Sequence, residues 1–265
     1  MKSRYELILN LLRHSGREIG VDELASKLGV SVATVRRDLE KLESEGLLIR
    51  THGGAIAISS SFVSPSLRER MRNNLREKIE IAETALQLVG NHETIILSDG
   101  STTYQIALLL KESPLELRVI TNDLNISLEL AGTRRIETIL IGGRITDHYS
   151  VGGYLGEKVL ESLYNEGSSI DKAFIGADAI DLQYGLTAFR ESDVKIIQIM
   201  AKLAKKVIAV VDHTKFGNSR FTPLLSLEEV DLIITDSGMP QEEADAYRNK
   251  GIELIIAQPL KLPIP

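Results

Sequence analysis

From about residue 75 to residue 257, short β-rich runs alternate with amphipathic helical stretches, and no other feature of the sequence constrains the fold as strongly. Strands that alternate with helices favour a parallel sheet with helices on its faces, so the pattern predicts a Rossmann-like α/β domain with a mostly parallel sheet. The expected strands are 94–97, 117–121, 137–141, 173–175, 207–211, 232–235 and 254–257. The expected helices include 75–89, 192–204 and 241–250.

The N-terminal part of the chain has a different pattern. Between Tyr5 and Leu48 the apolar residues recur at helical spacing without an extended strand-like run, which predicts three short helices. A Ser-rich stretch with one Pro, 58–66, follows and is typical of a linker. We therefore expect a small helical domain at 1–57, a linker at 58–74, the α/β domain at 75–257 and a tail at 258–265.

The charge is distributed unevenly. The net charge of −6 argues against nonspecific coating of nucleic acid, because neutralising phosphates requires clustered Lys and Arg. Residues 1–57, however, carry nine Lys and Arg against eight Asp and Glu, whereas the rest of the chain carries 22 against 29. The acidic excess lies outside the N-terminal domain, as expected if only that domain meets DNA.

Other classes of protein are excluded by composition. Cysteine is absent, which excludes disulfides and thiolate metal sites, and we expect neither a metal nor a cofactor. No apolar run approaches the length of a membrane span, and the first residues lack the apolar region of a signal peptide. We expect a cytoplasmic protein with no membrane partner.

The order of residues from Val21 to Ser31 is typical of a helix-turn-helix motif. One helix stops at Gly29, which lets the backbone leave it, and Ser31 is placed to cap the next helix through its hydroxyl. In that second helix the Val and Leu residues form one inward stripe. The residues left at its exposed N-terminal turns can reach base edges or phosphates of duplex DNA: Ser31, Ala33, Thr34, Arg36 and Arg37.

Two short β-prone runs flank Gly53-Gly54 and predict a β-wing that presents Arg50 and His52 to the DNA backbone. A generic three-helix domain followed by a hairpin has the same pattern, with Arg36 and Arg37 on a solvated face. The pattern alone leaves both interpretations open.

A candidate anion site follows the expected strand 94–97, in a run of small residues that leads into a helix: Asp99, Gly100, Ser101, Thr102 and Thr103. Free backbone N–H groups at a helix N-terminus, together with hydroxyl donors, suit a phosphate. A capped turn without a ligand has the same features.

Loops at the carboxyl ends of parallel strands converge on one crevice, so polar residues after other strands are further candidates. We expect Asp99, Asn122 and Asp178 near sugar hydroxyls, Lys215 as a charge partner of the phosphate, and Gly143 and Glu191 at the same pocket. Other roles remain open: Lys215 as a surface lysine, Asn122 as a turn former and Asp178 as a cap. Arg190 and Glu191 could line the mouth of the pocket or pair with each other.

The stretch 31–55, SVATVRRDLEKLESEGLLIRTHGGA, resembles the signature of the DeoR family of bacterial sugar-catabolism regulators. The second half is similar to the family's sensor domain in its DGSTT, TND, IGGR, FIGAD and HTKFG segments. The resemblance implies a winged helix-turn-helix that binds double-stranded operator DNA and a sensor domain similar in fold to ribose-5-phosphate isomerase that responds to phosphorylated sugars. The family loop usually reads Asp-x-Gly-Thr-Thr, and Ser101 replaces that Gly, so either the backbone there is ordinary or the phosphate sits differently.

Two functions fit these observations. The first is a repressor of a carbohydrate-catabolism operon, released by a sugar phosphate and homo-oligomeric, since a two-fold protein reads a two-half-site operator. The second is a sugar-phosphate isomerase or deaminase with a DNA-binding appendage. Its carboxylates would be Asp99, Asp178 and Glu191, with His213 as the nearest histidine, but binding of hydroxyls explains these carboxylates equally well. We favour the regulator and expect no catalytic residue. Whether it represses or activates transcription remains open.

Overall fold

The computed structural model describes residues 4–15, 18–44, 48–51, 53–57, 67, 70–71, 73–146, 148–165, 170–192 and 194–260. The chain forms two compact units, residues 1–63 and 64–265. The division falls inside the expected linker 58–74, of which 58–66, 68–69 and 72 lie outside the described residues, as do His52 and 261–265 of the expected tail. None of the described helices is long and apolar enough to cross a membrane.

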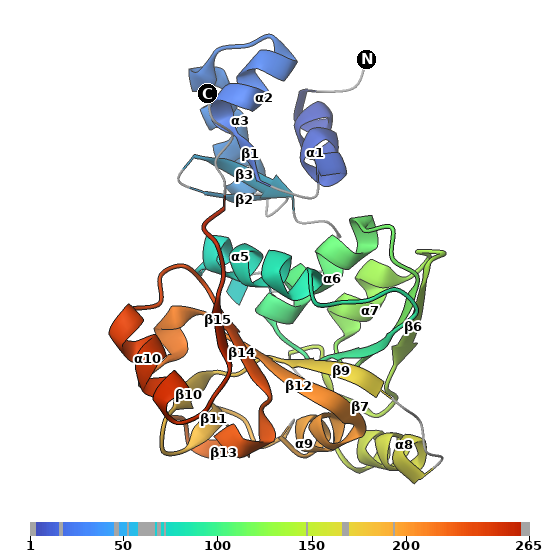
Figure 1. Cartoon of the computed structure of the whole chain (residues 1–265). Helices are drawn as coiled ribbons and strands as arrows, with labels where there is room; N and C mark the ends of the chain where they lie inside the picture. The colour runs from blue at the N-terminus through green and yellow to red at the C-terminus, as the bar shows by residue number, and fades with distance from the viewer. Residues whose placement is uncertain are drawn as a thin grey trace. The chain divides into compact units, whose positions relative to one another are not determined.

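The N-terminal unit combines three helices with a small antiparallel sheet (Figure 1). The helices are α1 (Arg4–Ser15), α2 (Val21–Leu28) and α3 (Val32–Ser44), and the sheet has the order β1 (Ile19–Gly20), β3 (Gly54–Ala57), β2 (Leu48–Arg50). The three expected helices are thus confirmed. A Cβ on Gly54 would lie 2.2 Å from the carbonyl oxygen of Ile19, so the β1–β3 approach requires a glycine there. The two-residue strand β1 is too short to show as a pattern in the sequence.

The larger unit contains a seven-stranded sheet in which every neighbouring pair is parallel, which confirms the expected α/β class. In spatial order the strands are β15 (Leu254–Ile256), β14 (Leu232–Thr235), β12 (Ala204–Val210), β9 (Ile170–Ile175), β4 (Thr94–Leu97), β5 (Leu117–Thr121) and β6 (Ile136–Leu140). Strands β9 and β12 each begin three residues earlier than expected. Their first residues include charged ones that pair across the strands, such as Lys205 with Asp171 at 3.0 Å. Because these charged residues interrupt the apolar runs, the sequence pattern placed the strand starts too late.

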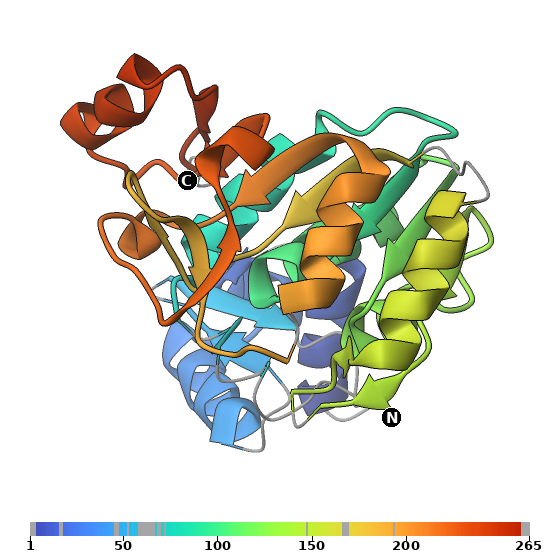
Figure 2. The ribbon, with the colours of Figure 1, turned by 90° about the horizontal axis from the view of Figure 1, so that it is seen from below.

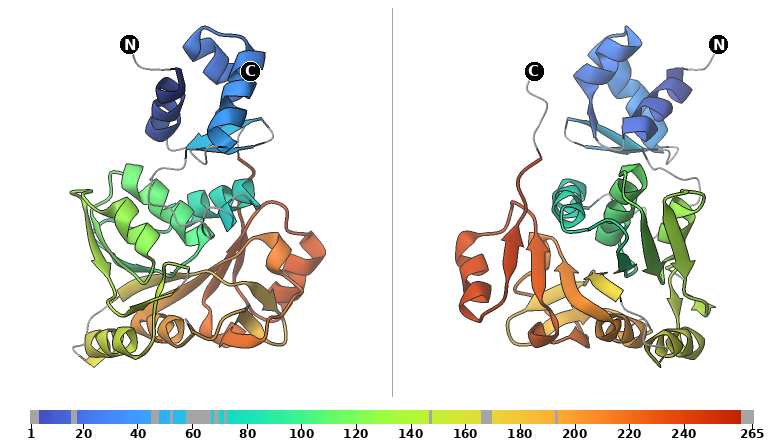
Figure 3. Two further views of the ribbon diagram at one scale, coloured as in Figure 1. Left: turned by 180° about the vertical axis from the view of Figure 1, so that it is seen from behind. Right: turned by 45° about the vertical axis from the view of Figure 1, so that its right-hand side comes forward.

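Helices cover both faces of this sheet (Figures 1 and 3). One face carries α5 (Leu75–Leu86), α6 (Ser101–Glu112) and α7 (Leu124–Leu130), and the other carries α8 (Tyr154–Asn165) and α9 (Val194–Leu203). Burial on both faces explains why the strands are near-continuous apolar runs. Ile95, Ile96 and Leu97 of β4 have no exposed area, and each contributes roughly 1.5–3 kcal/mol of apolar burial.

Smaller elements surround the sheet (Figure 2). An antiparallel sheet has the order β10 (Ala179–Asp181), β11 (Gly185–Ala188), β13 (Thr222–Leu225). A ribbon pairs β7 (Arg144–Ile145) with β8 (Val151–Gly152). Helix α10 (Gln241–Asn249) confirms the helix expected at 241–250. The remaining elements are the 3-10 turns η1 (His213–Lys215) and η2 (Leu227–Glu229). The strands of the antiparallel sheet and of the ribbon, and the two 3-10 turns, escaped the sequence patterns because these short segments gave no usable periodicity.

Candidate functional site

Helix α3 begins and is oriented as its sequence predicts. Gly29 ends α2 in the left-handed conformation at φ 65°, and the backbone N–H of Thr34 donates to Ser31 Oγ at 3.2 Å. On the inner face Val35, Leu39 and Leu42 are buried. The turn and the cap together fix where the outer face of α3 points within the unit.

The outer face of α3 carries two free guanidinium groups. Arg36 and Arg37 are exposed and form no hydrogen bond or ion pair with the residues that the structure describes. Ala33 beside them is exposed as well, whereas the hydroxyl of Thr34 lies 2.9 Å from Ser31 Oγ. The helix is held from behind by Arg4, whose Nε donates to the buried carboxylate of Asp38 at 2.5 Å. A rigid helix with free cations suits a polyanionic ligand.

The cation of the wing is already paired. Arg50 Nη1 lies 3.1 Å from Glu40 Oε1 on α3, and the Arg50 backbone N–H donates to Glu43 Oε1 at 3.2 Å. These contacts fix β2 to α3. To bind a phosphate, Arg50 would have to share or leave its contact with Glu40.

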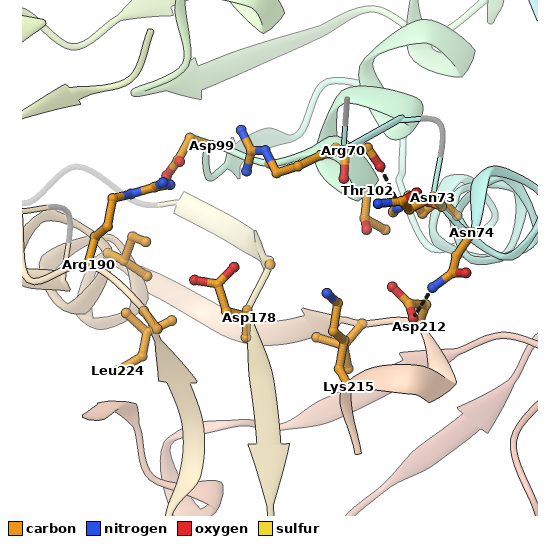
Figure 4. A pocket seen from close by; sticks show the side chains of 18 of the residues that line it. Arg70, Asn73, Asn74, Asp99, Thr102, Asp178, Arg190, Asp212, Lys215 and Leu224 are labelled. Atoms are coloured by element: carbon orange, nitrogen blue, oxygen red, sulfur yellow. Dashed lines mark hydrogen bonds between the residues drawn. The ribbon is translucent and has the colours of Figure 1, made fainter. Parts of the chain in front are cut away.

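The α/β unit holds a cavity of about 130 Å³ at the carboxyl ends of β4, β9 and β12 (Figure 4). A single water needs about 10–15 Å³ by the same kind of measure, so the cavity has room for a small organic molecule. The polar side chains that line it are Arg70, Asn73, Asn74, Lys78, Asp99, Ser101, Thr102, Asp178, Arg190, Asp212 and Lys215. They come from several loops, at the place where open parallel sheets bind ligands.

The N-terminus of α6 opens into this cavity. Gly100 is its N-cap and supplies no side-chain cap, and the first helical hydrogen bond runs from Tyr104 N–H to the Gly100 carbonyl at 3.0 Å. The N–H groups of Ser101, Thr102 and Thr103 precede that bond and have no acceptor among the described residues. Ser101 has an ordinary helical backbone, and the positive φ of 156° falls on Gly100 instead. The backbone at the replaced Gly is therefore ordinary.

A second layer of polar residues holds the loop before α6. Asp99 N–H donates to Asn122 Oδ1 at 2.9 Å, and Asn122 Nδ2 donates back to Asp99 Oδ1 at 3.2 Å. Gly100 N–H donates to Asp123 Oδ2 at 3.4 Å. Burial and the charge of Asp99 raise the pKa of Asp123 to about 6. Asn122 thus braces the loop and does not line the cavity itself.

Cations from α5 and the segment before it form one wall. The Nε and Nη2 atoms of Arg70 are buried and have no hydrogen-bond partner in the part of the chain that the structure describes. Lys78 is buried and donates to the carbonyls of Arg70 and Asn73, and burial lowers its pKa to about 8. Asn74 donates to Asp212 Oδ1 at 3.0 Å, which fixes this segment to the loop after β12 (Figure 4). The buried Nε and Nη2 atoms of Arg70 are therefore available to donate hydrogen bonds to a ligand.

The structure brings together six of the ten expected effector residues: Asp99, Gly100, Ser101, Thr102, Asp178 and Lys215. Four others lie outside the cavity. The Thr103 hydroxyl is buried and donates to the Gly100 carbonyl at 3.0 Å, and Asn122 braces Asp99. Gly143 lies between β6 and β7, and Glu191 is exposed.

Four lining residues escaped the sequence analysis: Arg70, Asn73, Asn74 and Lys78. Arg70, Asn73 and Asn74 lie in the expected linker, where polar residues are common. Lys78 lies among the apolar positions of α5, and a lysine on the buried side of a helix was the one available signal. Asp178 accepts from Phe189 N–H at 2.9 Å, so it is a cap for that turn as well as a lining residue.

His213, the nearest histidine for the isomerase alternative, does not line the cavity. His213 Nδ1 lies 2.7 Å from the buried carboxylate of Asp236, and no described histidine lines the cavity.

Comparison with known proteins matches both units. The family model described as DeoR C terminal sensor domain matches residues 73–237, and that described as DeoR-like helix-turn-helix domain matches residues 4–61. A putative aga operon transcriptional repressor from Escherichia coli O157:H7 is 31% identical, covering 96% of this chain and 93% of the relative. The glycerol-3-phosphate regulon repressor of Escherichia coli K12 is 30% identical, covering 95% and 97%.

Among solved structures, ribose 5-phosphate isomerase A from Neisseria gonorrhoeae is 19% identical and covers 54% of each chain, with a TM-score of 0.39.

Proposed function

This chain belongs to the DeoR family of transcriptional regulators, and from that membership we propose that it is a repressor whose affinity for operator DNA falls when a phosphorylated sugar fills the cavity of the α/β unit. Two relatives are named as repressors, one of an aga operon and one of a glycerol-3-phosphate regulon. The proposal assigns binding to each unit and catalysis to neither.

One observation carries the choice of a phosphorylated ligand. The open N-terminus of α6 and the partnerless, buried Arg70 nitrogens belong to the same cavity. A helix N-terminus favours an anion, and a guanidinium fork matches the oxygens of a phosphate. Lys215 on η1 adds a second positive charge. A phosphate would satisfy these donors together.

Three carboxylates support a ligand with hydroxyl groups. Asp99, Asp178 and Asp212 line the same cavity as the cations. Carboxylates accept hydrogen bonds from hydroxyls, whereas they would repel a ligand that carries anionic groups at both ends. A polyol with one phosphate fits a cavity lined by both cations and carboxylates, because the phosphate pairs with the cations and the hydroxyls donate to the carboxylates.

Release of DNA requires the ligand to favour a conformation that binds DNA poorly. Arg70, Asn73 and Asn74 lie in the expected linker 58–74 and also line the cavity. A ligand that bonds to them changes how the end of the linker is held. The two affinities are then coupled reciprocally, typically by about 1–3 kcal/mol.

A thermal-shift assay tests the proposal with a panel of sugar phosphates, their parent sugars and inorganic phosphate. A ligand that binds only the folded state raises Tm by mass action, and we expect one phosphorylated member to do so while its free sugar does not. Ser101→Asp places a fixed negative charge at the open helix end and should abolish the shift. Equal shifts with free and phosphorylated sugars would refute the phosphate site.

That sugar phosphate is then titrated into the protein bound to a duplex selected from a random library. Wild type should release the duplex. Ser101→Asp should bind it with unchanged affinity and remain bound.

A further inference from the structure

Five large apolar side chains stand exposed around the β7–β8 ribbon and α8: Ile145, Tyr149, Tyr154, Leu155 and Val159. We call these five residues the ribbon–α8 surface. Tyr154 and Leu155 are 68% and 66% exposed. Ile145 pairs with Val151 in the ribbon, and α8 begins two residues after β8 ends, so the five residues lie on adjoining elements. A concentration of this kind marks an interaction surface.

The ribbon is fixed to the core of its unit. Val151 N–H donates to the Asn122 carbonyl at 2.6 Å, and Leu124 N–H donates to the Tyr149 carbonyl at 2.9 Å. Tyr149 has a φ of 64°, an unfavourable conformation for a bulky residue that persists only where surrounding bonds enforce it. A surface already held in place loses little conformational entropy when a partner binds.

Helix α8 has an inner face that packs against the unit and an outer face that is exposed. Leu160 has no exposed area, and a Cβ on Gly156 would lie 2.7 Å from Ile196 Cδ1 of α9, so this side packs against the unit. Leu155 and Val159, four residues apart, form an apolar stripe on the other side. Figure 2 shows α8 at the edge of the unit with α9 on its inner side.

We propose that the ribbon–α8 surface binds the same surface of a second copy of this chain, with the two α8 helices antiparallel across a two-fold axis. An isologous interface requires a self-complementary patch. Lys158 and Glu161 pair at 2.5 Å beside the stripe. A parallel pair in register would place like charges opposite one another, and an antiparallel pair avoids this.

The size of the surface fits such a dimer. At about 150–250 Å² for an aromatic side chain, Tyr154 and Tyr149 together expose roughly 170–280 Å² per copy, given exposed fractions of 68% and 44%. The three aliphatic residues expose a similar area. Two copies therefore offer on the order of 1,000 Å², the lower limit for a specific interface. The dimer would also carry two copies of α3, which matches an operator with two half-sites.

Sedimentation velocity on the full-length protein tests the surface. We expect the wild type to dimerise and Leu155→Glu to weaken the dimer at least 100-fold, because the substitution enters the interface twice. Tyr184→Glu is the matched control, since Tyr184 is 56% exposed on the β10–β11 turn, outside the surface. Unchanged dimerisation of folded Leu155→Glu, or a wild type that stays monomeric at about 100 µM, would overturn the proposal.

Cysteine cross-linking tests the orientation, with no background because the chain contains no cysteine. In the antiparallel arrangement Leu155 of one copy faces Val159 of the other. A mixture of Leu155→Cys and Val159→Cys proteins should therefore oxidise to a covalent dimer at least ten times faster than either alone. Tyr184→Cys should remain uncross-linked. A mixture that reacts no faster than Tyr184→Cys would overturn the antiparallel pairing.

Discussion

The guanidinium groups of Arg36 and Arg37 in the N-terminal unit, and the Nε and Nη2 atoms of Arg70 in the α/β unit, lack a hydrogen-bond partner among the described residues, but they differ in exposure. The first two are exposed and keep their hydration. Arg70 has two nitrogens withdrawn from water, and an unmatched buried polar group costs about 1–3 kcal/mol, more when it is charged.

The difference separates two kinds of anion binding. Exposed cations suit a long polyanion and give an affinity that falls steeply with salt. A buried cation suits a small anion that fits its cavity, and salt screens that contact far less.

The largest effect is expected at Arg70. Arg70→Gln removes the buried charge and should weaken binding of the sugar phosphate by about 2–5 kcal/mol, because truncating one partner of a buried charge pair leaves the other unmatched. Arg118→Gln is the control, since Arg118 pairs with Glu137 at 2.8 Å on an exposed part of β5. Isothermal titration at two salt concentrations measures both. Wild-type affinity in Arg70→Gln would place the phosphate elsewhere.

The sequence predicted some of the residues that line the cavity but not Arg70. The loop from Asp99 to Thr102 was identifiable because strand, small residues and helix follow one another directly. Arg70 lies in a polar stretch whose place is decided by contacts far along the chain, such as that of nearby Asn74 with Asp212. Local patterns carry no information about such contacts.

The N-terminal unit was more predictable for the same reason. Its helix cap, turn and outer face depend on residues within about four positions of one another, as Ser31 and Thr34 show. The pairing of Arg50 with Glu40 was missed because it depends on how β2 docks on α3. Gly143, expected at the cavity, lies beyond β6 because a strand end on the sheet is not necessarily next to the ligand.

The next effect concerns Lys78, whose burial lowers its pKa from the ordinary 10.5 to about 8. Below pH 8 the lysine is charged in both the folded and the unfolded state, and the folded state bears the cost of burial. Between about pH 8 and 10.5 the unfolded state binds more protons, so this residue makes the free energy of unfolding rise with pH, by up to about 3 kcal/mol.

Urea denaturation from pH 7 to 10.5 measures that slope. Lys78→Met should lose the rise, whereas Lys27→Met should keep it, because Lys27 is exposed and pairs with Glu23 on α2. Equal slopes in Lys78→Met and wild type would show that burial does not disfavour the charged lysine.

Effects on DNA should be smaller. Arg37→Ala is expected to weaken operator binding by about 1–3 kcal/mol if Arg37 reads a base, or to lower the salt slope by about one unit if it binds a phosphate. Arg36→Ala gives the companion measurement, and Lys27→Ala on α2 is the exposed control. Fluorescence anisotropy across a salt series distinguishes the outcomes. If both arginine variants bind like wild type, α3 is not the recognition helix.

The smallest effect is expected at Arg50, because its guanidinium already lies 3.1 Å from Glu40 Oε1. An exposed ion pair is worth about 0–1 kcal/mol, so a phosphate gains little by displacing it. Glu40→Gln frees the cation and should strengthen binding to every duplex by at most about 1 kcal/mol, with a steeper salt slope. Arg50→Ala should weaken binding by a similar amount without changing sequence preference. If Arg50→Ala alters sequence preference while the salt slope stays constant, Arg50 reads bases, and its contrast with the buried Arg70 no longer rests on phosphate binding.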